Sequence, residues 1–299
     1  MRIGFIGLGN MGGPMASHII AAGHTVTVHD IRKEAASPQL DKGAAWADSP
    51  RAVAAASEIV FTSLPGPKQV EEVALGEGGI LQGAEPDSVY IDLSTSSPTL
   101  IRDICATFQD KQVQVLDAPV SGGPVGAQAA TLAVMVGGDK AVYERVKPVL
   151  DVIGDKVSYV GGIGCGEIAK IVHNMIGICS LSLLAEGLTL GVKAGVEPQA
   201  LLQAIQDGAV GQGLMLNYMV PEVVFKGDFD TARFALRWAR KDVGLATELG
   251  REFEVPLKLA NVVEQEFVEA MARGWAERDS SAPFALQEER SGVTVRKTS

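Results

Sequence analysis

The sequence predicts an α/β fold, with a doubly wound, mostly parallel sheet in the first half of the chain and an all-helical second domain joined to it through a long helix. In the first half, short β-branched and apolar runs alternate with longer helical patterns, which is typical of βαβ units around a buried parallel sheet. From residue 166 to residue 194 one largely apolar helical pattern follows, and the rest of the chain has helical patterns with little strand signal.

Each predicted strand is a short apolar run, and most of these runs are followed by glycine or proline. They span residues 2–6, 25–29, 59–63, 89–92, 113–117, 132–136 and 157–160. A glycine cluster at 161–164 marks a junction, because glycine permits the backbone turns that a domain boundary needs. We therefore expect a first domain over residues 1–163, a long connecting helix over 164–193 and a helical domain over 194–299.

The composition favours small-molecule chemistry. A chain of 299 residues that is 46% hydrophobic can bury more than one core, which agrees with two domains. Its net charge of −10 opposes binding to nucleic acid or to an anionic membrane, since the long-range field would repel both. We expect neither nucleic acid nor membrane as a partner.

The cysteine and histidine patterns suggest no disulfide framework and no metal site. Cys105, Cys165 and Cys179 form no CxxC pair, and the four histidines lack metal-ligand spacing. The apolar run Ile3–Leu8 is too short for an export signal, and Met175–Leu184 is interrupted and falls short of the roughly 20 apolar residues of a membrane span. These features predict a soluble protein of the reducing cytoplasm, with no bound metal.

A glycine-rich loop directly follows the first predicted strand and opens a helix. In this context the GxGxxG spacing is typical of a Rossmann-type dinucleotide site. Gly7 would allow the tight turn, Gly9 would let the pyrophosphate approach the backbone, and Gly12 would let helix and strand pack closely. The helix N-terminus would then attract the phosphates. The predicted cofactor contacts in this loop are Gly7, Leu8, Gly9, Asn10, Met11 and Gly12.

Asp30 directly follows the second predicted strand, about 20 residues beyond the glycines. A carboxylate there accepts the ribose hydroxyls and repels a 2′-phosphate, so the sequence predicts NAD as the preferred cofactor. Arg32, two residues later, could turn toward a 2′-phosphate, which leaves NADP open.

Five motifs follow one another along the chain. The first is the opening GFIGLGNMGGPMA. The others are Asp92-Leu93-Ser94-Thr95 with Pro98, the segment from Asp117 to Gly123, Gly164-Cys165-Gly166 with Lys170 and Asn174, and Lys241-Asp242 with Leu245-Ala246. Together and in this order they resemble the motifs of the β-hydroxyacid dehydrogenase family, whose members are 3-hydroxyisobutyrate dehydrogenase-like. The resemblance spans nearly the whole chain, and it implies a Rossmann domain and an NAD(P) cofactor.

The resemblance also implies roles for individual residues. It makes Lys170 the catalytic residue and Asn174 a neighbour that orients the substrate. It implies a substrate-carboxylate loop at Ser121, Gly122 and Gly123, cofactor contacts at Leu64, Pro65, Thr95 and Phe234, and a contact of Lys241 with both nicotinamide and substrate.

The residue types suit this chemistry. Hydride transfer at an alcohol carbon needs a group that takes up or supplies the hydroxyl proton. Lys170 has apolar neighbours on its helix, and desolvation together with the nearby cation of Lys241 should lower its pKa. Asn174, four residues later, lies on the same helix face. Ser121 and the two following glycines could form a backbone nest for a carboxylate.

We therefore expect an NAD(P)-dependent dehydrogenase that oxidises a short 3-hydroxy acid or reduces a semialdehyde, such as succinic, tartronic or methylmalonic semialdehyde. A non-catalytic dinucleotide-binding module and an imine reductase on the same scaffold are the alternatives. The apolar helix predicts a homodimer or homotetramer, because one small helical domain would leave its surface exposed.

Overall fold

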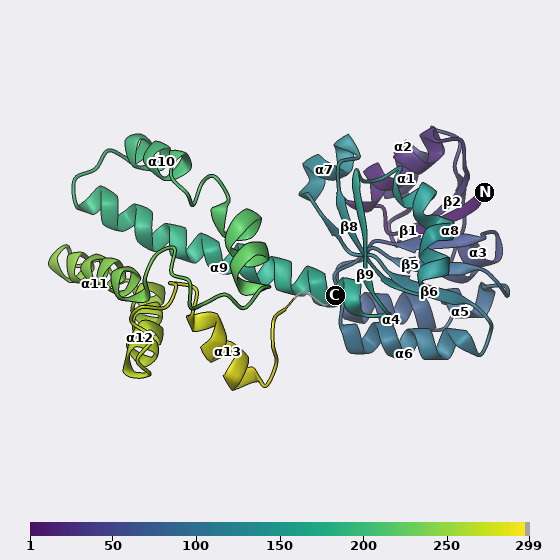
Figure 1. Ribbon diagram of the computed structural model, residues 1–299. Helices are drawn as coiled ribbons and strands as arrows, with labels where there is room; N and C mark the ends of the chain where they lie inside the picture. Colours follow the sequence, from purple (N-terminus) through teal and green to yellow (C-terminus); the bar gives the residue numbers. More distant parts are fainter. Residues whose placement is uncertain (297–299) are drawn as a thin grey trace. The chain divides into compact units, whose positions relative to one another are not determined.

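The computed structural model describes residues 1–296, apart from the side chains of Ser182, Trp238, Leu245, Leu249 and Glu252. Within these residues the chain forms two compact units, Met1–Met175 and Ile176–Ser299, of which positions 297–299 lie outside the described part. The predicted limits of 1–163, 164–193 and 194–299 stay a prediction. Because the positions of the two units relative to one another are not determined, each unit is described by itself (Figure 1).

The first unit is built on one sheet, drawn with its helices in purple to teal in Figure 1. In the described residues its strand order is β3-β2-β1-β4-β5-β6-β8-β7, and β9 pairs with β8. The strands are β1 (Arg2–Ile6), β2 (Thr25–His29), β3 (Ala45–Trp46), β4 (Ile59–Thr62), β5 (Val89–Asp92), β6 (Gln114–Asp117), β7 (Val120–Ser121), β8 (Ala133–Gly138) and β9 (Lys156–Gly161). The prediction of a mostly parallel sheet is confirmed: β8 is antiparallel to β6 and β7, and the other pairs are parallel.

Helices cover both faces of this sheet, so the predicted doubly wound architecture is also confirmed. Alternate residues of the central strands face different cores: Phe61 and Ile91 belong to one apolar cluster, and Val60 and Tyr90 to the other. The helical segments are α1 (Gly12–Ala21), η1 (Lys33–Ala36), α2 (Ser37–Leu40), α3 (Pro50–Ala55), α4 (Pro67–Leu75), α5 (Ile80–Gly83), α6 (Pro98–Gln109), α7 (Gly123–Ala129) and α8 (Lys140–Leu150).

The long helix α9 spans Cys165–Lys193, close to the predicted bounds, and crosses the division between the units. As a whole it is apolar enough to pass a test for membrane spans by length and composition, with a mean hydropathy of 1.7 over 18 residues. The prediction against a membrane span rested on its central part alone, Met175–Leu184, which is too short to cross a membrane. A single helix of this kind is weak evidence for a membrane, and only 6% of this apolar stretch is buried within the chain.

The second unit is helical throughout its described part, as predicted, apart from one isolated bridge between Ala235 and Asp279. After α9 it contains α10 (Pro198–Asp207), the π-helical η2 (Met215–Val224), α11 (Leu236–Glu252), α12 (Lys258–Ala272) and α13 (Pro283–Ser291). Glu186 of α9 accepts hydrogen bonds from the first-turn N–H groups of Leu259 and Ala260, at 2.8 and 3.2 Å. This carboxylate therefore caps α12 and joins it to α9.

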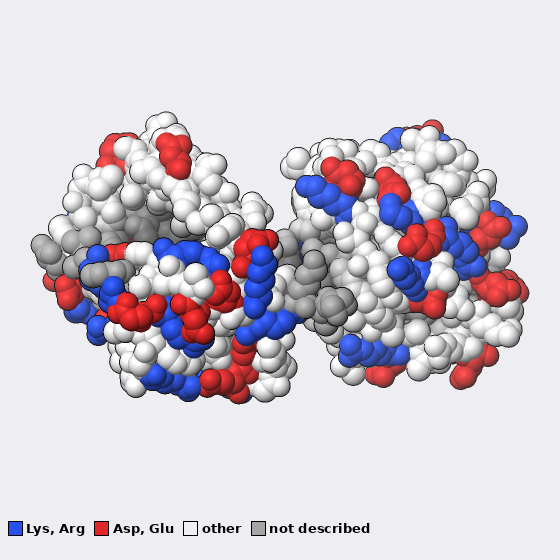
Figure 2. Space-filling model, viewed as in Figure 1, with Lys and Arg blue, Asp and Glu red and all other residues white. Residues whose placement is uncertain are grey.

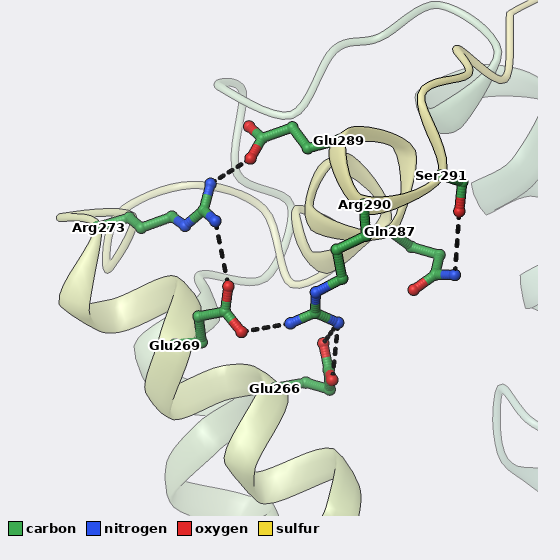
Figure 3. A network of polar contacts seen from close by, with 7 residues as sticks. All are labelled: Glu266, Glu269, Arg273, Gln287, Glu289, Arg290 and Ser291. Carbon is green, nitrogen blue, oxygen red and sulfur yellow. Dashed lines mark hydrogen bonds and ion pairs between the residues drawn. The ribbon is translucent and has the colours of Figure 1, made fainter.

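A network of ion pairs joins α12 to α13 (Figure 3). Arg290 pairs with Glu266 at 2.7 Å and also with Glu269, and Arg273 pairs with Glu269 at 3.1 Å and with Glu289. Exposed pairs are individually weak, but shared partners make such a network more effective than isolated pairs. On the face of the molecule shown in Figure 2, acidic and basic side chains are interspersed over both units.

Candidate active site

The carboxyl ends of four neighbouring parallel strands lie at one edge of the sheet. Ile6 of β1 pairs in register with Thr62 of β4, which pairs with Asp92 of β5. Asp92 in turn pairs with Asp117 of β6. Ligands of open α/β sheets bind at this edge. The segments that follow these strands contain the predicted residues 7–12, Leu64 and Pro65, Thr95, and Ser121 to Gly123.

The three glycines of the first loop have different surroundings. Gly7 has a φ of +91°, and a Cβ there would lie 2.3 Å from the carbonyl oxygen of Ser63. A Cβ on Gly12 would lie 1.9 Å from the carbonyl oxygen of Gly7, so helix and loop pack backbone to backbone. A Cβ on Gly9 would meet nothing within 4 Å. The protein itself therefore requires glycine at positions 7 and 12, whereas position 9 is open toward a ligand.

A cavity of about 690 Å³ adjoins this loop. Its volume lies within the range that is usual for cofactor pockets. Its lining includes Gly7, Gly9, Asn10, Met11, Gly12, Asp30, Leu64 and Pro65 of the predicted cofactor residues. Leu8 is buried and lines a second, neighbouring hollow. The backbone N–H groups of the glycine loop and the open position at Gly9 fit a dinucleotide, whose phosphates would lie at the N-terminus of α1.

Asp30 holds the glycine loop in place. One carboxylate oxygen accepts the backbone N–H of Leu8 at 2.7 Å, and the other accepts that of Arg32 at 2.8 Å. The carboxyl group is almost fully buried, whereas the side chain of Arg32 is 71% exposed and its Nε lies 3.8 Å from Asp30. Since each carboxylate oxygen has a second lone pair, Asp30 can hold the loop and still accept ribose hydroxyls.

Lys170 lies in the second turn of α9 with only 8% of its surface exposed. Burial lowers the pKa of its amine below the ordinary value, and the nearby carboxyl of Glu167 acts in the opposite direction. The pKa of Lys170 is therefore shifted in the predicted direction. Of the two predicted causes, desolvation and the cation of Lys241, desolvation makes the largest contribution to this shift. Lys241, the other predicted cause, belongs to the second unit, where its Nζ lies 2.9 Å from Asp242.

Two of the predicted substrate residues are connected through His173. The Oγ of Ser121 lies 3.4 Å from Nε2 of His173, whose Nδ1 lies 3.2 Å from Oδ1 of Asn174. Gly122 and Gly123, at the start of α7, have φ values of +135° and +61°, which few other residues adopt. His173 is exposed, and its position beside Ser121 depends on a contact between residues 52 positions apart, which no local pattern reveals.

The remaining predicted residues lie in different places. Thr95 is exposed in the loop after β5. Phe234 and Lys241 belong to the second unit, where Phe234 is exposed just before α11 and Lys241 lies within that helix. The structure therefore brings the predicted residues of the first unit to one sheet edge, and the contacts of all the predicted residues with cofactor or substrate stay a prediction.

Three buried carboxyl groups behind this edge were not predicted. Asp117 accepts the N–H groups of Gly164 and Glu167, each at 2.8 Å, and so caps the N-terminus of α9. Asp92 accepts both the N–H and the Oγ–H of Ser94, at 3.0 and 2.6 Å. Asp92 and Asp117 begin two of the family-like motifs of the sequence, whereas the role of the third, Glu167, depends on partners far away in sequence.

Family models and known proteins match nearly the whole chain. Residues 2–161 match the NAD binding domain of 6-phosphogluconate dehydrogenase, and residues 164–286 match the NAD-binding domain of NADP-dependent 3-hydroxyisobutyrate dehydrogenase. The 2-(hydroxymethyl)glutarate dehydrogenase of Eubacterium barkeri is 39% identical over 99% of this chain and 97% of its own. The 2-hydroxy-3-oxopropionate reductase of Escherichia coli K12 is 34% identical over 94% of this chain and 95% of its own.

Solved structures agree with these matches. Mycobacterium tuberculosis 3-hydroxyisobutyrate dehydrogenase, solved with L-serine, is 33% identical with a TM-score of 0.67, covering 96% of this chain and 99% of its own. An imine reductase of Myxococcus stipitatus, solved with NADP+, matches with a TM-score of 0.84, covering 96% of this chain and 100% of its own. Its sequence identity is only 19%, so this match shows the fold alone. The chain belongs to the β-hydroxyacid dehydrogenase family, and it is an NAD(P)-dependent oxidoreductase that acts on the CH–OH group of a small hydroxy acid.

Proposed function

We propose that this enzyme interconverts a short 3-hydroxy acid and its semialdehyde, with Lys170 as the general acid and base. The observation that carries the proposal is the buried amine of Lys170, whose pKa is lowered by burial. Lys170 belongs to the same compact unit as the glycine loop. A lysine that loses its proton more easily can take up and return a proton near neutral pH.

The chain's own residues would perform the proton transfer and hold the substrate. In the oxidation, the neutral amine of Lys170 accepts the hydroxyl proton of the substrate, and in the reduction its ammonium returns that proton to the carbonyl oxygen. The nicotinamide, when bound, takes up or supplies the hydride. Ser121 and the N–H groups of the following glycines would bind the carboxylate, and Asn174, one helical turn from Lys170, would orient the substrate.

The names of the similar enzymes point to one substrate class. The compounds 3-hydroxyisobutyrate and 2-(hydroxymethyl)glutarate share the unit HOCH2–CH(R)–COO−, and 2-hydroxy-3-oxopropionate is an aldehyde of the same skeleton. They differ in the group R, which is methyl, carboxyethyl or hydroxyl. We propose that this chain acts on the same unit, with the primary alcohol carbon as the site of hydride transfer.

Asp30 supports NAD over NADP. Its carboxyl is buried and held by two backbone N–H groups, so it cannot turn away to admit a 2′-phosphate without breaking them. The exposed side chain of Arg32 is the group that would favour NADP.

Assays of C3 to C5 hydroxy acids and semialdehydes with each cofactor test these proposals. The expected result is turnover of compounds with the HOCH2–CH(R)–COO− unit, with kcat/KM higher for NAD than for NADP by about tenfold or more, because a buried carboxylate repels the phosphate charge. Matched secondary alcohols and 2-hydroxy acids serve as controls. Turnover of only those controls would contradict the substrate class, and a preference for NADP would contradict the role of Asp30.

We also propose that the chain is a cytoplasmic homodimer or homotetramer. The second unit exposes large apolar side chains on several helices: Ile178, Leu181 and Leu183 of α9, Leu202 of α10, Met215 and Leu216 of η2, and Val262 of α12. A second copy of the chain would cover such a surface from water. Light scattering on the purified protein should give a mass of at least twice 31.4 kDa, and a mass of one chain would contradict the proposal.

A further inference from the structure

Glu167 lies completely buried in the first turn of α9, one helical turn before Lys170. One of its carboxyl oxygens, Oε2, accepts the backbone N–H of Ser96 at 2.8 Å. The other, Oε1, has no hydrogen-bond partner among the residues that the structure describes, and the same holds for Oδ2 of Asp92 and Oγ of Ser96. A buried carboxylate with so few donors is costly, because an ionised carboxyl group can only accept hydrogen bonds.

The three buried carboxyl groups differ in how well their negative charge is stabilised. Oδ1 of Asp92 accepts the hydroxyl of Thr62 and both the hydroxyl and the N–H of Ser94. Both oxygens of Asp117 accept backbone N–H groups at the start of α9. Glu167 accepts one N–H group. Burial raises the pKa of all three carboxyl groups, and hydrogen bonds to the charged form oppose that rise most at Asp92 and Asp117. If one of the three keeps a proton, it is therefore Glu167.

We infer that Glu167 stays protonated and neutral near neutral pH, and that it acts as a positioning residue which tunes the charge of Lys170. This inference rests on the proposed role of Lys170. The neutral acid carries an O–H donor that the carboxylate lacks, in a buried region where Oδ2 of Asp92 is an acceptor without a partner among the described residues. Its remaining oxygen still accepts the N–H of Ser96, so the loop beside the cofactor edge stays joined to the helix of Lys170.

The charges around Glu167 support its neutral state. Burial and the carboxylates of Asp92 and Asp117 raise the pKa of Glu167 to about 8, against the opposing effect of Lys170. Arg102 brings a positive charge to the turn before α9, where its Nε donates to the carbonyl oxygen of Ile163 at 3.3 Å, but its side chain is exposed and water screens that charge. Burial raises the pKa of the Tyr90 hydroxyl and that of the Cys105 thiol, so both stay neutral.

The proton on Glu167 has a consequence for Lys170. An ionised Glu167 would hold the ammonium of Lys170 and raise its pKa, as the direction of its effect shows. A neutral Glu167 does not raise the pKa of Lys170. Below a pH of about 8, the ammonium group of Lys170 therefore loses its proton more easily. Above that pH, ionisation of Glu167 would oppose further loss of the proton from Lys170. The two groups therefore titrate as a coupled pair.

Infrared spectroscopy of the whole enzyme tests the protonation state directly. The wild type should show the carbonyl band of a neutral buried carboxyl group near pH 7, and the band should weaken as the pH rises through about 8. Glu167→Gln should lack the band, whereas Glu144→Gln, on the exposed surface of α8, should keep it. A wild type without the band near pH 7, or a band that survives in Glu167→Gln, would overturn the inference.

The pH profile tests the effect on Lys170. Since the amide of glutamine resembles the neutral acid, Glu167→Gln should keep at least about half of the wild-type kcat near pH 7. The rise of the oxidation rate with pH should have a lower midpoint in Glu167→Gln than in the wild type, by about half a pH unit or more, because no anion forms beside Lys170. Equal midpoints, or a loss of kcat of about tenfold or more in a folded variant, would overturn the inference.

Two further variants keep the outcomes apart. Glu167→Ala leaves the N–H of Ser96 without a partner and should lower the melting temperature, which measures the structural contribution of the side chain. Lys170→Ala should keep the infrared band of Glu167. An active Lys170→Ala enzyme with that band intact would mean that the proposed function fails while Glu167 is still neutral.

Discussion

Replacing Lys170 by alanine is expected to lower kcat by about 10²- to 10⁴-fold, the range that a positioned general acid or base contributes. The variant loses the amine that exchanges the hydroxyl proton, whereas the glycine loop, Asp30 and the cavity beside them are formed by other segments. Binding of NAD, measured by fluorescence titration, should therefore stay within about threefold of the wild type.

Lys170→Arg and Lys193→Ala make this test specific. Arginine keeps the positive charge but does not lose its proton in proteins, so Lys170→Arg should be nearly as inactive as Lys170→Ala if proton transfer is the role. Lys193 lies at the exposed end of the same helix, where its Nζ lies 3.4 Å from the carbonyl oxygen of Glu254, and its replacement by alanine should leave kcat unchanged. Turnover of Lys170→Ala close to that of the wild type would disprove the proposed mechanism.

Replacing Gly9 by alanine should weaken the binding of NAD by about tenfold or more without unfolding the protein. In the protein alone a Cβ at this position meets nothing within 4 Å, so the added methyl group costs little in folding. The space that it occupies is the one through which a pyrophosphate would approach the backbone. Titration with NAD and thermal unfolding measure the two effects separately.

Gly12→Ala is the matched contrast in the same loop. Its Cβ would lie 1.9 Å from the carbonyl oxygen of Gly7, and overpacking of this kind costs about 1–3 kcal/mol. The melting temperature of Gly12→Ala should fall by several degrees, while that of Gly9→Ala should stay near the wild-type value. Normal NAD affinity in Gly9→Ala would show that the loop does not hold the cofactor as proposed.

The fold was largely predictable because its signals are local. Each predicted strand lies within about two residues of an observed one, since short buried β-branched runs bounded by glycine or proline identify parallel strands. The two strands that were not predicted, Ala45–Trp46 and Val120–Ser121, have two residues each, too few for any pattern. The antiparallel direction of β8 was not predicted either, because it depends on how the chain returns through β7.

The site was predictable only in part, for a related reason. Motifs identified the glycine loop and Lys170, whose chemistry follows from neighbouring residues. Glu167 has partners 50 and 71 positions away in sequence, and the surroundings of its carboxyl group arise from strand register. His173 likewise reaches Ser121 across the fold. Roles that depend on such distant contacts have no signature in a single sequence.

A crystal structure of the enzyme with NAD and an unreactive 3-hydroxy acid analogue would test the central role of Lys170 most directly. The account predicts that Nζ of Lys170 lies within hydrogen-bond distance, about 2.6–3.2 Å, of the oxygen on the carbon that faces the nicotinamide. An amine that points into solvent in that complex, with another group bonded to the oxygen, would contradict it.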